Sequence, residues 1–162
     1  MKPIRPHELA GVPLGHPPDD GWSGRGKWLK VPDVAAQFGH QGASVKVKVD
    51  NGLVSAVELR LPTLDPGDAH RLHSDLLRTI TNDPEWDAVH KPRNGSMTFR
   101  QSRSQLRIGI TFRADATIGD VRVVLQQTAD DHPTAIERSR AATDQTAVAA
   151  QQLLAAILGD TQ

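Results

Sequence analysis

Apolar and polar residues alternate in two blocks of the chain, and a helical pattern follows each block. In the first block, residues 45–49 and 57–61 alternate on either side of an Asp-Asn-Gly turn. In the second block the same alternation covers residues 97–99, 106–112 and 121–125. Alternation with a period of two is typical of strands with one buried face. We therefore predict an α+β fold in a single domain: a roughly five-stranded, mainly antiparallel sheet in ββα-βββα order, with both main helices on one face.

The turn in the first block can be closed in two ways. A two-residue Asn-Gly loop would place the large apolar residues of the two strands on opposite faces. A three-residue loop over residues 50–52, with its glycine in the left-handed conformation, would pair Val49 with Leu53 and Val45 with Val57. All the large side chains would then share one face, so we predict the three-residue loop.

Residues 65–68, Asp-Pro-Gly-Asp, predict the start of the first main helix. The Asp65 side chain can cap the first turn, and Pro66 suits the first helical position. The apolar stripe that follows has helical spacing and is predicted to be buried: Ala69, Leu72, Leu76 and Ile80. The helix ends at Asn82-Asp83-Pro84, and we expect Trp86 to dock against the core beyond it.

The last helix is predicted to start near Pro133 and to end before Gly159. Its surface is rich in alanine, and its large apolar residues are Ile136, Val148, Leu153, Leu154, Ile157 and Leu158. Small side chains let another helix or a sheet approach closely. Two interpretations are open: packing inside the domain, or formation of a homo-oligomer through this Ala-rich C-terminal helix.

The first 42 residues differ from residues 43–162, which we predict to form the α+β domain. Proline and glycine are so frequent between residues 1 and 32 that we predict an arm without regular strand ladders, followed by a short helix near residues 31–38. The arm contains Trp22 and Trp28, and indole rings are costly to leave in water. These tryptophans either pack on their own domain or anchor a partner protein.

Charge balance limits the electrostatic partners. The chain has 19 Lys+Arg and 19 Asp+Glu, so no global field attracts nucleic acid or an anionic membrane. The predicted strands are nevertheless net positive, and the helical segments are net negative. Outward-facing strand positions would form a basic platform on the sheet face opposite the helices: Lys46, Lys48, Arg100, Arg107, Arg113 and Arg122.

This platform has three interpretations: a solvated face, a protein-binding face or a nucleic-acid-binding face. Exposed arginines often serve only to keep a sheet soluble and to prevent edge pairing. In the predicted register the face has no aromatic side chain on which bases could stack, which weighs against single-stranded nucleic acid.

The sequence contains little that indicates catalysis. It has no cysteine and no tyrosine, and the motifs GxxxxGKS/T, GxGxxG after a strand, GxSxG and HExxH are absent. His70 and His73 share a helix turn, but two histidines without further ligands are more typical of a polar helix face than of a metal site. The run Asp130-Asp131-His132 is interpreted as a helix cap. We predict no enzyme activity, catalytic residue, metal or cofactor.

No segment has the length and hydropathy of a signal peptide or a membrane helix, so we expect a cytoplasmic protein without a membrane partner. The hairpin and the Asp-Pro-initiated helix, residues 45–80, resemble the core of the YbaB/EbfC family of small dimeric nucleoid-associated proteins. That resemblance implies a dimer that binds DNA. The long N-terminal helix typical of the family has no counterpart in the Pro/Gly-rich arm.

These observations favour a non-enzymatic module that binds another protein, of the inhibitor, immunity, secretion-adaptor or virion-assembly type. The alternative is a nucleic-acid-binding protein that uses the arginine-rich sheet face.

Overall fold

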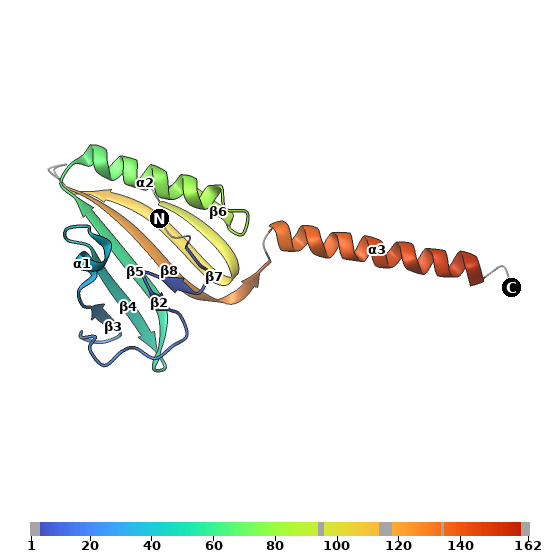
Figure 1. Cartoon of the computed structure of the whole chain (residues 1–162), viewed down its shortest axis with the longest axis horizontal. Coiled ribbons are helices and arrows are strands. Elements are labelled where there is room, and N and C mark those ends of the chain that lie inside the picture. Colours follow the sequence, from blue (N-terminus) through green and yellow to red (C-terminus); the bar gives the residue numbers. More distant parts are fainter. Residues whose placement is uncertain (1–3, 94–95, 114–117, 134, 160–162) are drawn as a thin grey trace.

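The computed structural model of the chain describes residues 4–93, 96–113, 118–133 and 135–159 (Figure 1). In this part of the chain the fold is α+β, with a six-stranded antiparallel sheet, a separate two-stranded sheet and three helices. The large sheet has the strand order β3-β4-β5-β8-β7-β6. The elements in chain order are β1 (Glu8–Leu9), β2 (Val12–Pro13), β3 (Trp28–Val31), α1 (Val34–Phe38), β4 (Ser44–Asp50), β5 (Leu53–Thr63), α2 (Pro66–Thr81), β6 (Asp87–Arg93), β7 (Ser96–Phe112), β8 (Gly119–His132) and α3 (Ala135–Gly159).

The α+β class and the antiparallel sheet are confirmed, but the predicted five-stranded order is not matched. The sequence pattern does not predict β3 and β6, which form the two edges of the sheet. The strands predicted at residues 97–99 and 106–112 are parts of one long strand, β7. An irregularity near Ser102, whose φ is 48°, interrupts the pairing of β7 with β8 without ending the strand.

Helix α2 follows the sequence prediction. The Asp65 carboxylate accepts a hydrogen bond of 2.8 Å from the Gly67 N–H group, and Pro66 is the first helical residue. The helix lies along one face of the sheet and contacts β5, β7 and β8 (Figure 1). Three of the four residues of the predicted stripe are buried and the fourth, Leu72, is partly buried. The packing of this stripe on the sheet forms one part of the hydrophobic core.

The N-terminal arm contributes to the same core. Leu9, Val12 and Leu14 belong to the buried cluster of the sheet. Trp86 is buried, as predicted, and its Nε1 donates a hydrogen bond of 3.2 Å to the carbonyl oxygen of Ile4. The contacts with the arm therefore close the part of the apolar sheet face that α2 does not cover.

The prediction that the arm lacks regular ladders is wrong. Strands β1 and β2 pair with each other, and β3 pairs with β4 over four residues. For β3 the physical reason is local, because Trp28–Val31 contains neither proline nor glycine and can donate every hydrogen bond that the ladder needs. The short helix predicted near residues 31–38 is confirmed as α1, which ends at Gly39 with a φ of 61°.

The β4–β5 turn corrects the predicted loop. Asn51 and Gly52 have φ angles of 53° and 77°. Positive φ at both central residues defines a two-residue type I′ turn. Val49 accordingly pairs with Val54 and not with Leu53.

A bulge reconciles this turn with a common apolar face. Ser55 is the extra residue on β5, and beyond it Val47 pairs with Val57. Val45 pairs with Leu59, which replaces the predicted pairing with Val57. The extra residue shifts the alternation of inward and outward side chains on β5 by one position. The large apolar side chains of both strands therefore share the buried face, which a two-residue turn without a bulge would not allow.

Helix α3 departs most from the prediction. It has the expected range but extends away from the sheet beyond the end of β8 (Figure 1). All residues from Arg138 to Gly159 are exposed. The prediction that both main helices cover one sheet face is therefore wrong, and α3 does not pack inside the domain. The reason is that α2 and the arm already bury the apolar face, so the sheet offers α3 no further apolar surface.

Candidate binding surfaces

The sheet face opposite α2, which we call the outer face, collects cationic side chains from five strands, including Lys30 on β3, which pairs with Lys46. Directly paired residues project from the same face of a sheet. Lys46 on β4 pairs with Glu58 on β5. Glu58 and Arg107 both pair with the same residue of β8, so Lys46, Glu58 and Arg107 lie in one row across the sheet. In the neighbouring row Arg60 is paired with Arg122. The outer face therefore contains part of the predicted basic platform.

Three of these cations line a small notch on the outer face. The notch has a volume of about 90 Å³ and is lined by Ser44, Lys46, Glu58, Arg60 and Arg122. This volume corresponds to about three water molecules, so the notch has room for one small anionic group. Sequence reasoning missed Arg60, although its alternation with two buried leucines on β5 is visible in the sequence.

Ion pairs hold two of the notch cations in place. Arg60 Nη2 lies 2.5 Å from the Oδ2 atom of Asp120, a carboxylate that is 10% exposed. Arg122 Nη1 lies 3.6 Å from Glu58 Oε1. Among the described residues, Lys46 forms no ion pair. The notch thus combines two ion-paired guanidinium groups with one ammonium group that forms no ion pair with a described residue.

The other members of the predicted platform differ in their surroundings. Arg107 and Arg113 are exposed on β7 and beyond its end and form no ion pair with a described residue. Arg100 instead donates from Nη2 to Thr128 Oγ1 and to the carbonyl oxygen of Asp130, both at 2.8 Å. These bonds tie Arg100 to β8, so it is not available to a ligand in the way that Arg107 is.

A smaller charge cluster surrounds Asp50 at the hairpin tip. The Ser55 hydroxyl donates a hydrogen bond of 2.7 Å to this carboxylate, and Lys27 Nζ and Lys48 Nζ lie 3.1 Å and 3.6 Å from it. The hydrogen bond from Ser55, followed by that from Lys27, lowers the pKa of Asp50 below its ordinary value of 3.8. Lys48 is therefore partly neutralised within the platform.

The two arm tryptophans lie in different environments. Trp22 is partly buried and packs against the core cluster. Trp28 is 39% exposed and pairs with Lys48 across β3 and β4, so both side chains belong to the outer face. The prediction that this face has no aromatic side chain is therefore wrong. It failed because β3 is absent from the predicted sheet.

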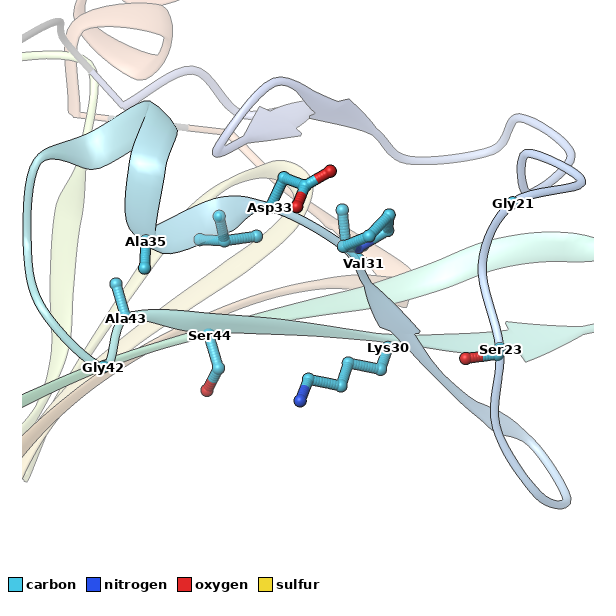
Figure 2. A pocket seen from close by; sticks show the side chains of 11 residues that line it. Gly21, Ser23, Lys30, Val31, Asp33, Ala35, Gly42, Ala43 and Ser44 are labelled. Atoms are coloured by element: carbon cyan, nitrogen blue, oxygen red, sulfur yellow. The ribbon is translucent and has the colours of Figure 1, made fainter.

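A larger pocket of about 500 Å³ lies between the arm, α1 and β4 (Figure 2). Its charged lining residues are Lys30 and Asp33. Figure 2 shows that Lys30 and Ser44 point to one side, whereas Asp33 lies on the other. The pocket thus brings no pair of ionisable groups together for acid–base chemistry.

Two of the histidines singled out in the sequence, His70 and His132, have ordinary structural contacts. The His70 ring packs against Phe112 with 4.9 Å between ring centroids. His132 is the last residue of β8 and not a helix cap, and its Nε2 lies 3.1 Å from Asp87 Oδ2 on β6. Among the described residues, no group of three or more His, Cys, Asp or Glu side chains could hold a metal ion.

The first turn of α3 is attached to the sheet through Asp87. Arg138 Nη2 donates to Asp87 Oδ2 at 3.1 Å, and Arg138 Nη1 donates to the carbonyl oxygen of Pro133 at 2.7 Å. Beyond this turn the helix exposes large apolar side chains that are between 51% and 64% accessible: Val148, Leu153, Leu154, Ile157 and Leu158. Residues 145–159 contain no charged side chain. The described helices include none that is both long and apolar enough to cross a membrane.

Comparison with known proteins found no matching family model, no similar curated protein and no similar solved structure. The resemblance of residues 45–80 to the YbaB/EbfC family thus receives no support from a family model.

Proposed function

We propose that the protein is a non-enzymatic module that binds another protein through α3. The observation that carries the proposal is the exposure of five large apolar side chains on a helix that does not pack on the sheet. Monomeric soluble proteins seldom leave such a continuous apolar surface uncovered, and partner proteins commonly receive an amphipathic helix in a groove. Inhibitors, immunity proteins, secretion adaptors and virion assembly proteins are the classes that fit such a module.

Comparative affinity capture from the native host tests this proposal. The bait proteins are the wild type, the double variant L154E/I157E and the control Q145E/Q152E. The control adds the same charge to the same helix at already polar positions on its opposite side. We expect mass spectrometry to find a partner with the wild type and the control that is lost with L154E/I157E. Identical captured proteins for all three baits would contradict the proposal.

The second candidate function is nucleic-acid binding by the outer face. It is favoured by the convergence of Lys46, Arg60 and Arg122 at the notch, and by the position of Trp28 beside Lys48. Cations that contact phosphates and an aromatic ring that stacks on a base are the usual elements of such a surface.

Binding of single-stranded and duplex DNA at several salt concentrations tests this alternative. The informative variant is K46E/R107E, because neither side chain forms an ion pair with a described residue and the fold should tolerate the change. The control is R71E/R78E, which reverses two charges on α2, where both arginines pair with aspartates of their own helix. We expect salt-sensitive binding that K46E/R107E weakens and the control retains. Absence of salt-sensitive binding by the wild type would eliminate this candidate.

A further inference from the structure

The apolar surface of α3 includes a narrow seam with coiled-coil spacing. Residues Thr143, Ala147, Ala150, Leu154 and Ile157 follow one another at intervals of four and three. This alternation of intervals keeps side chains on one side of a helix and is typical of a seam that packs against a second helix. Leu153 and Leu158 flank the seam on its two sides, and all seven residues are exposed.

The charge distribution indicates what covers this seam. Residues 145–159 are uncharged, whereas the charged residues of α3 lie nearer its start, at Glu137, Arg138, Arg140 and Asp144. A partner that is recognised by charge complementarity would need charged side chains on residues 145–159, and there are none. Helices that lie on a membrane surface typically have Lys or Arg on their polar face, and this stretch has none. A second copy of the same stretch brings no like charges together.

The order of small and large residues along the seam fits a second copy in antiparallel orientation. With a two-fold axis at the level of Gln152, Ala147 faces Ile157 of the partner subunit, and Ala150 faces Leu154 of the partner subunit. Each small side chain then lies opposite a large one, which fills the space between the helices. Parallel pairing would oppose alanine to alanine in the middle of the seam and leave that space underfilled.

The attachment of α3 to the sheet also agrees with this orientation. Residues 135–144 span about 15 Å of helix between the sheet and the paired stretch. Antiparallel pairing of residues 145–159 therefore places the two sheets at opposite ends of the helix pair. The overlap is only about 22 Å long. An interface of this size lies at the small end of specific interfaces, so we expect association in the micromolar range.

We propose that α3 is a self-association helix, and that two copies of the chain pair antiparallel through Ala147, Ala150, Leu154 and Ile157. The inference rests on the proposed function because it names the protein that α3 binds. It is an isologous contact, in which the same surface of both copies forms the interface.

Sedimentation velocity over a concentration series spanning the micromolar range tests the association. We expect the mass of the wild type to rise from 17.6 kDa towards twice that value. L154E should remain monomeric, while Q145E should associate like the wild type. A150L should weaken the dimer because it opposes two leucines in the antiparallel seam, and circular dichroism should show that all variants keep their helix content. A wild type that stays monomeric throughout, or an A150L variant that associates more tightly, would overturn the inference.

Disulfide trapping tests the orientation, and the absence of native cysteines makes introduced thiols unique. A147C and I157C are mixed and mildly oxidised, and intact mass distinguishes the three possible dimers. We expect the share of the mixed A147C–I157C dimer to lie well above the share that random pairing of an equal mixture gives. Predominance of A147C homodimers would overturn the antiparallel seam.

The capture experiment separates this inference from the proposed function. A monomeric wild type whose captured partner is lost with L154E/I157E would overturn self-association and support the proposed function. A monomeric wild type whose partners are unaffected by L154E/I157E would overturn both.

Discussion

Helices α2 and α3 have similar shares of large apolar residues in their sequences, yet they are used in opposite ways. Helix α2 has a capped start, a basic residue in its last turn and an apolar stripe buried on the sheet. Helix α3 is longer, has no basic residue in its last turn, and exposes its large apolar residues from Val148 onwards. Most helical stability in proteins comes from packing of an apolar face. Helix α2 gains this packing from its own sheet, whereas we propose that α3 gains it from another protein.

The largest expected difference concerns the same substitution in the two helices. Leu76→Ala in α2 should lower the free energy of unfolding by about 2–5 kcal/mol, because it leaves a cavity among fully buried residues. Leu154→Ala in α3 should change it by no more than about 0.5 kcal/mol in dilute protein, because the side chain is exposed. Urea unfolding of both variants checks this. A comparable loss in both would show that α3 packs on the sheet.

A second test adds one methyl group to each region. A Cβ atom at Gly119, on β8 beneath α2, would clash with the Cβ atom of buried Ala69. Gly119→Ala should therefore destabilise the protein by about 1–3 kcal/mol. Gly159→Ala, at the end of α3, meets no atom within 4 Å and should be neutral or slightly stabilising. Thermal unfolding distinguishes the two, and a neutral Gly119→Ala would contradict the close contact of α2 with the sheet.

A third test concerns backbone strain in the packed region. Gly52 has a φ of 77° in the two-residue turn, so Gly52→Val should cost about 1–3 kcal/mol. Asn51→Ala should cost less. Alanine adopts the left-handed conformation of position 51 at a smaller penalty than valine adopts that of position 52. Equal and small changes in unfolding temperature for both variants would contradict the type I′ turn.

The smallest expected effect is a pH dependence at the hairpin tip. The pKa of Asp50 is lower in the folded protein than its ordinary value of 3.8. Its ionised form therefore stabilises the fold above that pH, and the contribution is lost as the pH falls below 3.8 through the lowered pKa. The difference in unfolding temperature between wild type and Asp50→Asn should close over that range. A difference that stays constant with pH would contradict the assignment.

The sequence predicts the packed region well where side-chain pattern and backbone chemistry agree. The cap at Asp65 and the stripe of α2 follow from local rules that tertiary contacts do not alter. The hairpin turn could not be predicted from the apolar pattern. That pattern excludes a two-residue loop between regular strands, but the bulge at Ser55 restores a common apolar face with such a loop. Strand β7 is split in the prediction because its polar middle, around Ser102, interrupts the alternation.

The candidate surfaces were predictable only in part. Outward positions of the strands identify Lys46, Arg107 and Arg122, but the sequence does not reveal that Arg100 is tied to β8 or that Trp28 joins the outer face. An apolar helical pattern indicates that a face requires burial. It does not indicate whether the covering surface belongs to the same chain, so the sequence leaves both interpretations of α3 open.

Amide hydrogen exchange at low and high protein concentration tests the central claim most directly. We expect the amides of α3 between residues 145 and 159 to exchange rapidly in dilute protein and to become protected as the concentration rises. The amides of the β5, β7 and β8 core should remain unchanged. Strong protection of α3 in dilute protein would show that its apolar face packs on its own chain, and exchange that stays rapid at all concentrations would show that a second copy does not cover it.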